Sequence, residues 1–155
     1  MTCWMTSFLN LCYSLPHGLI AAAMAAPYCS KHSRATLRPL GPVRTPEHID
    51  GLPTNSPLQQ LAVEESAAIH DRSRFLLSEV DKKGGLAILE NPATSMTWDD
   101  PLMVQWVHTV VPFAAQASAC QFGRDWAKAW MFVANRPDIP SCCWCTSTDC
   151  RCTYG

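Results

Sequence analysis

Residues 84–92 of this chain, Gly84-Gly85-Leu86-Ala87-Ile88-Leu89-Glu90-Asn91-Pro92, decide its fold class. The apolar run 86–89 is uninterrupted, with two glycines before it and a polar pair and proline after it. Such a short bounded run predicts a strand that is buried in a sheet. The fold depends on what this strand pairs with, and the sequence before it supplies two further elements.

A long amphipathic helix is predicted from Pro57 to Lys83, directly before the strand. Ser56 suits the N-cap, Pro57 suits the first helical position and Gln59 completes a capping box. Lys82-Lys83 favours the negative end of the helix dipole, and Gly84-Gly85 ends the helix. At helical spacing, one face collects the apolar side chains that we expect to point to the core: Leu58, Leu61, Ala62, Ile69, Leu76 and Val80.

The run Leu19 to Ala26 is apolar and ends at Pro27, and it fits a buried strand or a helix, because alanine favours the helix. If it is a strand, the chain contains a strand–helix–strand crossover with Leu19–Ala26 and Leu86–Leu89 as parallel neighbours. Downstream we expect a short helix from Asp100-Pro101 to about His108. Two more strands, Phe113–Ala119 and Ala129–Ala134, should flank a turn at 121–125. The fold class is therefore α/β.

Composition supports one globular domain. The chain has 155 residues, of which 48% are apolar and 16% charged, enough to bury a core. Its net charge of -1 gives no general basic field for nucleic acid, so any such contact must be local. The Pro- and Gly-rich segment 30–55 is expected to be a long loop.

The N-terminal 26 residues carry no Lys, Arg, Asp or Glu and end in a run of small residues, so a signal peptide is the alternative reading. Against it, no positive charge precedes the apolar stretch, and Pro16-His17-Gly18 interrupts it. These features favour a nuclear or cytoplasmic protein over a secreted one. The same interruptions argue against a membrane-spanning helix, which needs roughly 20 mostly apolar residues.

Cys29 and Glu90 each follow or end a predicted strand. Ligands of open parallel sheets bind outside the carboxyl ends of the strands, so both side chains should emerge at one edge. A thiol and a carboxyl group there can serve covalent catalysis, as nucleophile and proton donor. Taken singly, each residue can also be explained without a function. The cysteine can be a small buried side chain, and the glutamate can be a charge in contact with solvent.

Three segments resemble motifs of the DNA cytosine-5 methyltransferases, in that family's order. Residues 26–33, Ala-Pro-Tyr-Cys-Ser-Lys-His-Ser, resemble its Pro-Pro-Cys-x-x-Phe-Ser loop, which also follows an apolar strand. Glu90-Asn91-Pro92 resembles its Glu-Asn-Val element. Residues 123–133, Gly-Arg-Asp-Trp-Ala-Lys-Ala-Trp-Met-Phe-Val, are similar to its Gly-Val-Pro-Gln-x-Arg-x-Arg-Val-Phe-Ile element.

The resemblance implies a partial Rossmann-like methyltransferase sheet over residues 18–137 and methyl transfer from S-adenosylmethionine to cytosine in DNA. Cys29 would add to C6 of the base, Glu90 would act at N3 as the acid, and C5 would accept the methyl group. The base would have to be flipped out of the duplex. The motif positions that would bind substrate are Pro27, Ser33, Asn91, Pro92 and Lys128.

The chain departs from the family in several places. Tyr28 separates Pro27 from the cysteine, and Lys128 and Trp130 stand where the family has two arginines. A Gly-rich turn after a first strand, the start of the cofactor site, is missing from the 18 residues before Leu19. We therefore expect a fragment that is inactive alone, with the upstream cofactor-binding segment as a missing partner. A positive potential for a Cys29 thiolate could come from Lys31, His32 or Lys128.

The two ends are assigned separately: residues 1–17 as an irregular N-terminus and 138–155 as a Cys-rich tail that holds five of the nine cysteines. The cysteine spacing of the tail fits no standard zinc finger, so no metal ligand is assigned. Residues 1–12 and 141–155 are expected outside the core. The alternatives to a methyltransferase-like fragment are a non-catalytic α/β binding or scaffold module and a small Cys-rich metal-binding or secreted protein.

Overall fold

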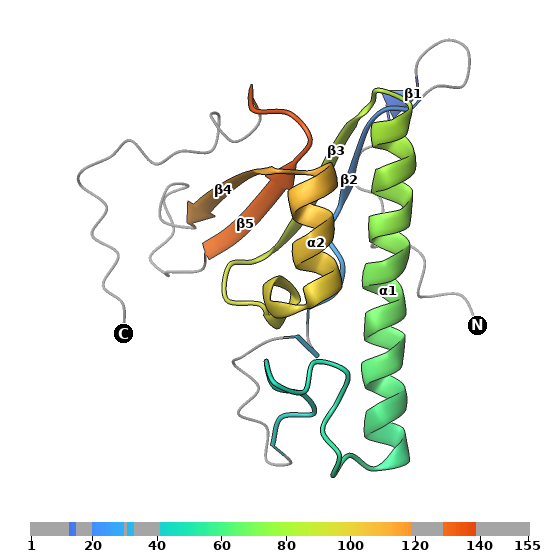
Figure 1. Cartoon of the computed structure of the whole chain (residues 1–155), viewed down its shortest axis with the longest axis vertical. Coiled ribbons are helices and arrows are strands. Elements are labelled where there is room, and N and C mark those ends of the chain that lie inside the picture. The colour runs from blue at the N-terminus through green and yellow to red at the C-terminus, as the bar shows by residue number, and fades with distance from the viewer. Residues whose placement is uncertain (1–12, 15–19, 30, 33–40, 119–128, 139–155) are drawn as a thin grey trace, which may run out of the picture.

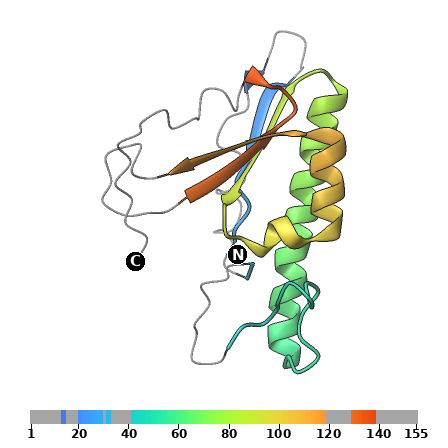
Figure 2. The same cartoon turned by 60° about the vertical axis from the view of Figure 1, so that its left-hand side comes forward.

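The computed structural model describes residues 13–14, 20–29, 31–32, 41–118 and 129–138. Within them one mixed β-sheet carries two α-helices on the same face (Figure 1 and Figure 2). The elements are β1 (Tyr13–Ser14), β2 (Ile20–Ala25), α1 (Pro57–Lys82), β3 (Leu86–Pro92), η1 (Met96–Asp99), α2 (Pro101–Val110), β4 (Phe113–Ser118) and β5 (Ala129–Ala134). The α/β class is therefore confirmed.

The sheet has the strand order β1-β2-β3-β5-β4. β2 and β3 are parallel, with Ala22 beside Leu86 and Ala25 beside Leu89, and α1 is the crossover between them. The apolar run before Pro27 is thus a strand over Ile20–Ala25, and the predicted parallel pair is confirmed. β5 lies between β3 and β4 and is antiparallel to both. The short β1, antiparallel to β2, has no counterpart among the predicted strands.

The ends of α1 form as the sequence predicts. Ser56 Oγ accepts a hydrogen bond from the Gln59 backbone N–H at 3.3 Å, and the Gln59 side chain accepts one from the Ser56 N–H at 2.8 Å. At the other end, Gly84 adopts a φ of 74°, which glycine reaches without a steric cost. The Gly85 N–H then donates to the Val80 carbonyl at 2.9 Å. These contacts set the helix length.

Ser56→Ala is expected to lower the free energy of unfolding by about 1 kcal/mol, because it removes the side-chain half of the capping box. Urea unfolding followed by circular dichroism measures the change. Thr54→Ala, at an exposed position two residues earlier, is the matched control and should change stability by less than about 0.5 kcal/mol. An equal effect of the two substitutions would show that the cap does not stabilise α1.

The prediction of which face of α1 is buried was wrong in part: Val80 is buried and Ala62 and Ile69 are half-buried, but the three leucines are not. Leu58, Leu61 and Leu76 are exposed, whereas the buried stripe is shifted around the helix and is half polar. Polar side chains can occupy this stripe because several of them have hydrogen-bond partners inside the molecule. The buried residues of α1 are Val63, Ser66, His70, Ser73, Leu77 and Val80.

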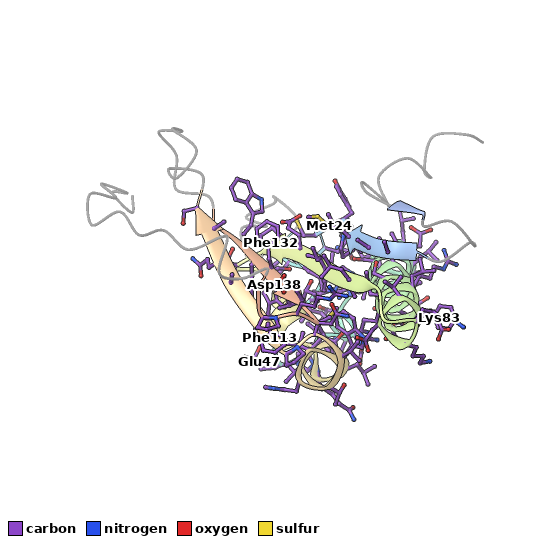
Figure 3. All side chains as sticks on the ribbon, turned by 90° about the horizontal axis from the view of Figure 1, so that it is seen from above. Met24, Glu47, Lys83, Phe113, Phe132 and Asp138 are labelled. Carbon is purple, nitrogen blue, oxygen red and sulfur yellow. The ribbon has the colours of Figure 1, made fainter. Side chains whose placement is uncertain are left out.

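The hydrophobic core lies between the helices and one face of the sheet. Side chains alternate along β3, so that Ala87 and Leu89 face the helices, and α2 contributes Met103 and Trp106. Figure 3 shows Met24 and Phe132 on the side of the sheet away from the helices, where both are half-buried. In the described ranges no helix combines the length and the apolar character needed to cross a membrane.

The downstream elements agree with the sequence pattern. α2 begins after Asp100, whose carboxylate accepts from the Leu102 N–H at 2.9 Å, and Pro101 occupies its first turn. The helix ends at Val110, two residues beyond the predicted end. β4 and β5 fall in the two predicted strand segments, while the turn at 121–125 lies outside the described residues.

Candidate functional site

The parallel pair β2–β3 determines where Cys29 and Glu90 lie. Glu90 directly follows Leu89, which pairs with Ala25 of β2, and Cys29 comes four residues after Ala25. Both segments therefore leave the sheet at the same edge, the carboxyl ends of the two strands. Glu90 and Cys29 are both half-buried. Because its neighbours Leu89 and Asn91 are buried on the helix side, Glu90 belongs to the other face of the sheet.

Two hydrogen bonds join the segment after β2 to the segment at the end of β3. Asn91 Nδ2 donates to the Pro27 carbonyl at 3.2 Å, and the Met96 N–H donates to the His32 carbonyl at 2.7 Å. The His32 N–H also donates to the Cys29 carbonyl at 2.9 Å, so the chain turns back between Cys29 and His32. Positions 64 apart in the sequence are thus held side by side.

His32 anchors this turn in a buried polar cluster, which we define as His32, Arg44, Ser66, His70, Ser95 and Thr97. Arg44 Nη1 donates to His32 Nε2, and Arg44 Nη2 donates to the Val63 carbonyl at 2.8 Å. An arginine has only donors, so His32 Nε2 must be the acceptor and the ring proton lies on Nδ1. That Nδ1 is 3.1 Å from Ser66 Oγ and donates to it.

His70 continues the cluster toward β3 and η1. Its ring lies 4.2 Å from the His32 ring, centroid to centroid. Its Nδ1 donates to the Ser66 carbonyl at 2.9 Å, and its Nε2 is 3.1 Å from Thr97 Oγ1. Ser95 Oγ in turn donates to Thr97 Oγ1 at 2.9 Å. The buried polar cluster therefore connects the turn at Cys29, the loop before α1, α1 itself and the segment after Glu90-Asn91-Pro92.

Burial keeps both histidines uncharged. Desolvation, followed by the electrostatic effects of the nearby His70 and Arg44, lowers the pKa of His32 to about 2. Desolvation is also the main cause that lowers the pKa of His70. The expectation that His32 could supply positive potential to a Cys29 thiolate is therefore wrong. The buried cation of this region is Arg44, whose pKa burial also lowers, and Lys31 is half-buried beside the turn.

The other predicted site residues are distributed as follows. Pro27 and Asn91 are brought together, and Pro92 lies opposite Trp130 in the β3–β5 pairing. Ser33 and Lys128 fall outside the described residues, as do residues 139–155 of the Cys-rich tail. Among the described residues no group of three His, Cys, Asp or Glu side chains is placed to hold a metal ion.

Sequence reasoning missed most of the buried polar cluster, notably Arg44, His70 and Thr97. One signal was available: Ser66, His70 and Ser73 recur at the same helical spacing as Val63, Leu77 and Val80, which marks a single stripe. A histidine within such a stripe is a candidate for a buried, hydrogen-bonded side chain. The partners from other segments could not be assigned from spacing.

A shallow apolar hollow of about 200 Å³ lies elsewhere, between α2 and the β4–β5 pair. Trp98, Val107, Ala114 and Met131 are among the side chains that line it, and neither Cys29 nor Glu90 does. The hollow and the sheet edge are therefore distinct features.

The chain was compared with known proteins at three levels. A scan against protein-family models gives no match, and searches of curated proteins and of solved structures likewise give none. The geometry of the sheet edge and the resemblance of its motifs are therefore the basis for a functional assignment.

Proposed function

We propose that this chain is the substrate-facing part of a DNA cytosine-5 methyltransferase-like domain, with Cys29 as nucleophile and Glu90 as acid. The observation that carries the proposal is the parallel pairing of β2 and β3, which sends both segments to one sheet edge. The hydrogen bond from Asn91 to the Pro27 carbonyl supports it, because it joins the two motifs that the resemblance singles out.

In the proposed chemistry the Cys29 thiolate forms a bond to C6 of a cytosine ring. The electron pair of the C5–C6 double bond shifts into the ring, and the Glu90 carboxylic acid gives a proton to N3, so that C5 becomes nucleophilic. Glu90 is half-buried and lies in β3, next to the segment that leads to Pro27 and Cys29. The transfer of a methyl group to C5 is implied by the family resemblance alone.

The described residues do not fit a site for S-adenosylmethionine. Of their glycines with positive φ, Gly84 ends α1, whereas Gly41 and Gly51 lie in the loop before it. A Cβ at Gly51 would collide with the Gln60 side chain, so the space beside Gly51 is taken by a side chain of α1. We assign no step that uses the cofactor to these residues, and we propose an upstream cofactor-binding segment as the partner that provides it.

The addition step can be tested without a methyl donor. The probe is a single-stranded oligonucleotide with 2-pyrimidinone in place of one cytosine, because its C6 accepts a thiolate readily and no base has to be flipped from a duplex. We expect a covalent adduct that peptide mass spectrometry locates at Cys29, absent from Cys29→Ser and retained in Cys120→Ser. Glu90→Gln should slow adduct formation by about a hundredfold or more, the range for a positioned acid.

Alkylation of Cys29 by iodoacetamide serves as the control for Glu90→Gln and should keep its rate, because that reaction needs no acid. An adduct on other cysteines, or one that forms equally in Cys29→Ser, would contradict the assigned nucleophile. Absence of any adduct would favour the non-catalytic α/β module. That alternative is supported by the buried polar cluster, whose histidines are fully used in structural hydrogen bonds.

A further inference from the structure

The outer face of α1 carries large apolar side chains that nothing in the described part of the chain covers. Leu58 is 77% exposed, Leu61 50%, Phe75 64% and Leu76 45%. Leu61 and Phe75 lie on the side of the helix away from the buried stripe, whereas Leu58 and Leu76 lie at its flank. In Figure 1 α1 runs along one side of the molecule. A set of large exposed apolar side chains rimmed by polar residues marks an interaction site.

The charges on this face are arranged so that two copies of it can pair with opposite charges facing each other. Glu65 and Arg72 are both exposed between the two apolar ends of the face, and neither forms an ion pair with another described side chain. They lie two turns apart on the same stripe, since seven residues advance a helix by nearly two full turns. The small side chain of Ala68 lies between them.

We propose that the outer face of α1 is the interface of a two-fold symmetric dimer of this chain, in which two copies of α1 pack antiparallel. A two-fold axis midway between positions 68 and 69 places Leu61 opposite Leu76 of the second copy. The same axis places Glu65 opposite Arg72, and each pair occurs twice. A C₂ interface must be self-complementary in this way. Ala68 at the centre lets the helices approach closely.

The inference goes beyond the proposed function and is independent of it. A single helix pair buries less surface than the roughly 1,200 Å² of a standard stable interface, so we expect a weak dimer with a micromolar Kd. The charged pairs set the antiparallel orientation, because a parallel arrangement would bring equal charges together.

Sedimentation of the full chain under reducing conditions, over a concentration series, tests the proposal. We expect a reversible shift to twice the mass. Glu65→Arg alone and Arg72→Glu alone should each raise the Kd at least about tenfold, since each creates two like-charge contacts. The double variant Glu65→Arg/Arg72→Glu restores opposite charges and should return the Kd to within about threefold of the original.

Leu102→Ser is the control, because Leu102 is 60% exposed on α2, away from this face, and it should leave the Kd unchanged. A chain that stays monomeric at about 100 µM, well above such a Kd, would overturn the proposal. So would a dimer that the single charge reversals do not weaken, or one that the double variant does not restore. Circular dichroism of every variant shows that the exposed substitutions leave the fold intact.

Discussion

Arg44→Met is expected to lower the free energy of unfolding by about 3 kcal/mol, because it leaves two buried acceptors without a donor. Arg44 is 2% exposed and donates to His32 Nε2 and to the Val63 carbonyl. Removing the guanidinium also saves the cost of desolvating a cation, which acts in the opposite direction. Two charge-assisted hydrogen bonds, at about 1.5–3 kcal/mol each, should outweigh that saving. Urea unfolding at pH 7 and low protein concentration measures the balance.

Two further variants separate charge from geometry. Arg44→Lys keeps the charge but not the planar fork that reaches two acceptors, so an intermediate loss is expected. Arg72→Met removes the same charge from an exposed position and should change stability by no more than about 0.5 kcal/mol. If Arg44→Met were as stable as the natural chain, desolvation would outweigh the hydrogen bonds, and Arg44 would not hold these segments together.

The sequence was sufficient to predict the elements of this fold where local signals were strong. Ser56, Gln59 and the Gly84-Gly85 pair bound α1, and the apolar runs before Pro27 and before Glu90 are the parallel strands. The sequence was insufficient to predict which side of α1 faces the core. The hydrophobicity pattern predicts that Leu61 and Leu76 are core residues. In the structure these two are exposed, and Ser66 and His70 are buried instead. The partners that make this possible come from distant segments.

In the candidate site, too, local sequence signals predict one part, and contacts between distant segments determine the rest. A shared edge for the segments of Cys29 and Glu90 follows from the parallel pairing of the two strands, which the structure confirms. A reactive pair of the two side chains stays a prediction. The turn that holds Cys29 depends on His32, and His32 depends on Arg44, which lies in the long loop before α1. No periodicity marks Arg44, because its side chain is buried by contacts that form only after the loop folds back on α1.

The hydrogen bonds of the two buried histidines predict how the chain responds to acid. In the folded state His32 Nε2 accepts from Arg44 and His70 Nε2 accepts from Thr97. A second ring proton on His32 would point at the Arg44 guanidinium, replacing an attraction by a repulsion between two buried cations. Burial is the main cause that lowers the pKa of His32 to about 2, and the nearby His70 and Arg44 add to it; burial also lowers the pKa of His70.

Between pH 7 and pH 5 the free energy of unfolding should fall by about 2 kcal/mol from His32 alone. The unfolded chain takes up a proton on His32 below pH 6.5, whereas the folded chain resists it until about pH 2. The stability is therefore fully present above pH 6.5 and is lost as the pH falls, and His70 adds to the loss. Urea unfolding at pH 7, 6 and 5 gives the slope.

His32→Gln isolates this contribution from that of the carboxyl groups, which titrate in both chains. The variant is less stable at pH 7, because glutamine cannot reproduce both hydrogen bonds of the ring, yet its stability should decline with acid by about 2 kcal/mol less than that of the natural chain. His48→Gln, at an exposed position, is the control and should leave the slope unchanged. A His32→Gln chain with the natural slope would mean that His32 is protonated in the folded state. Arg44 would then not be donating to its Nε2, and the hydrogen bonds that hold the Cys29 turn would have to be assigned differently.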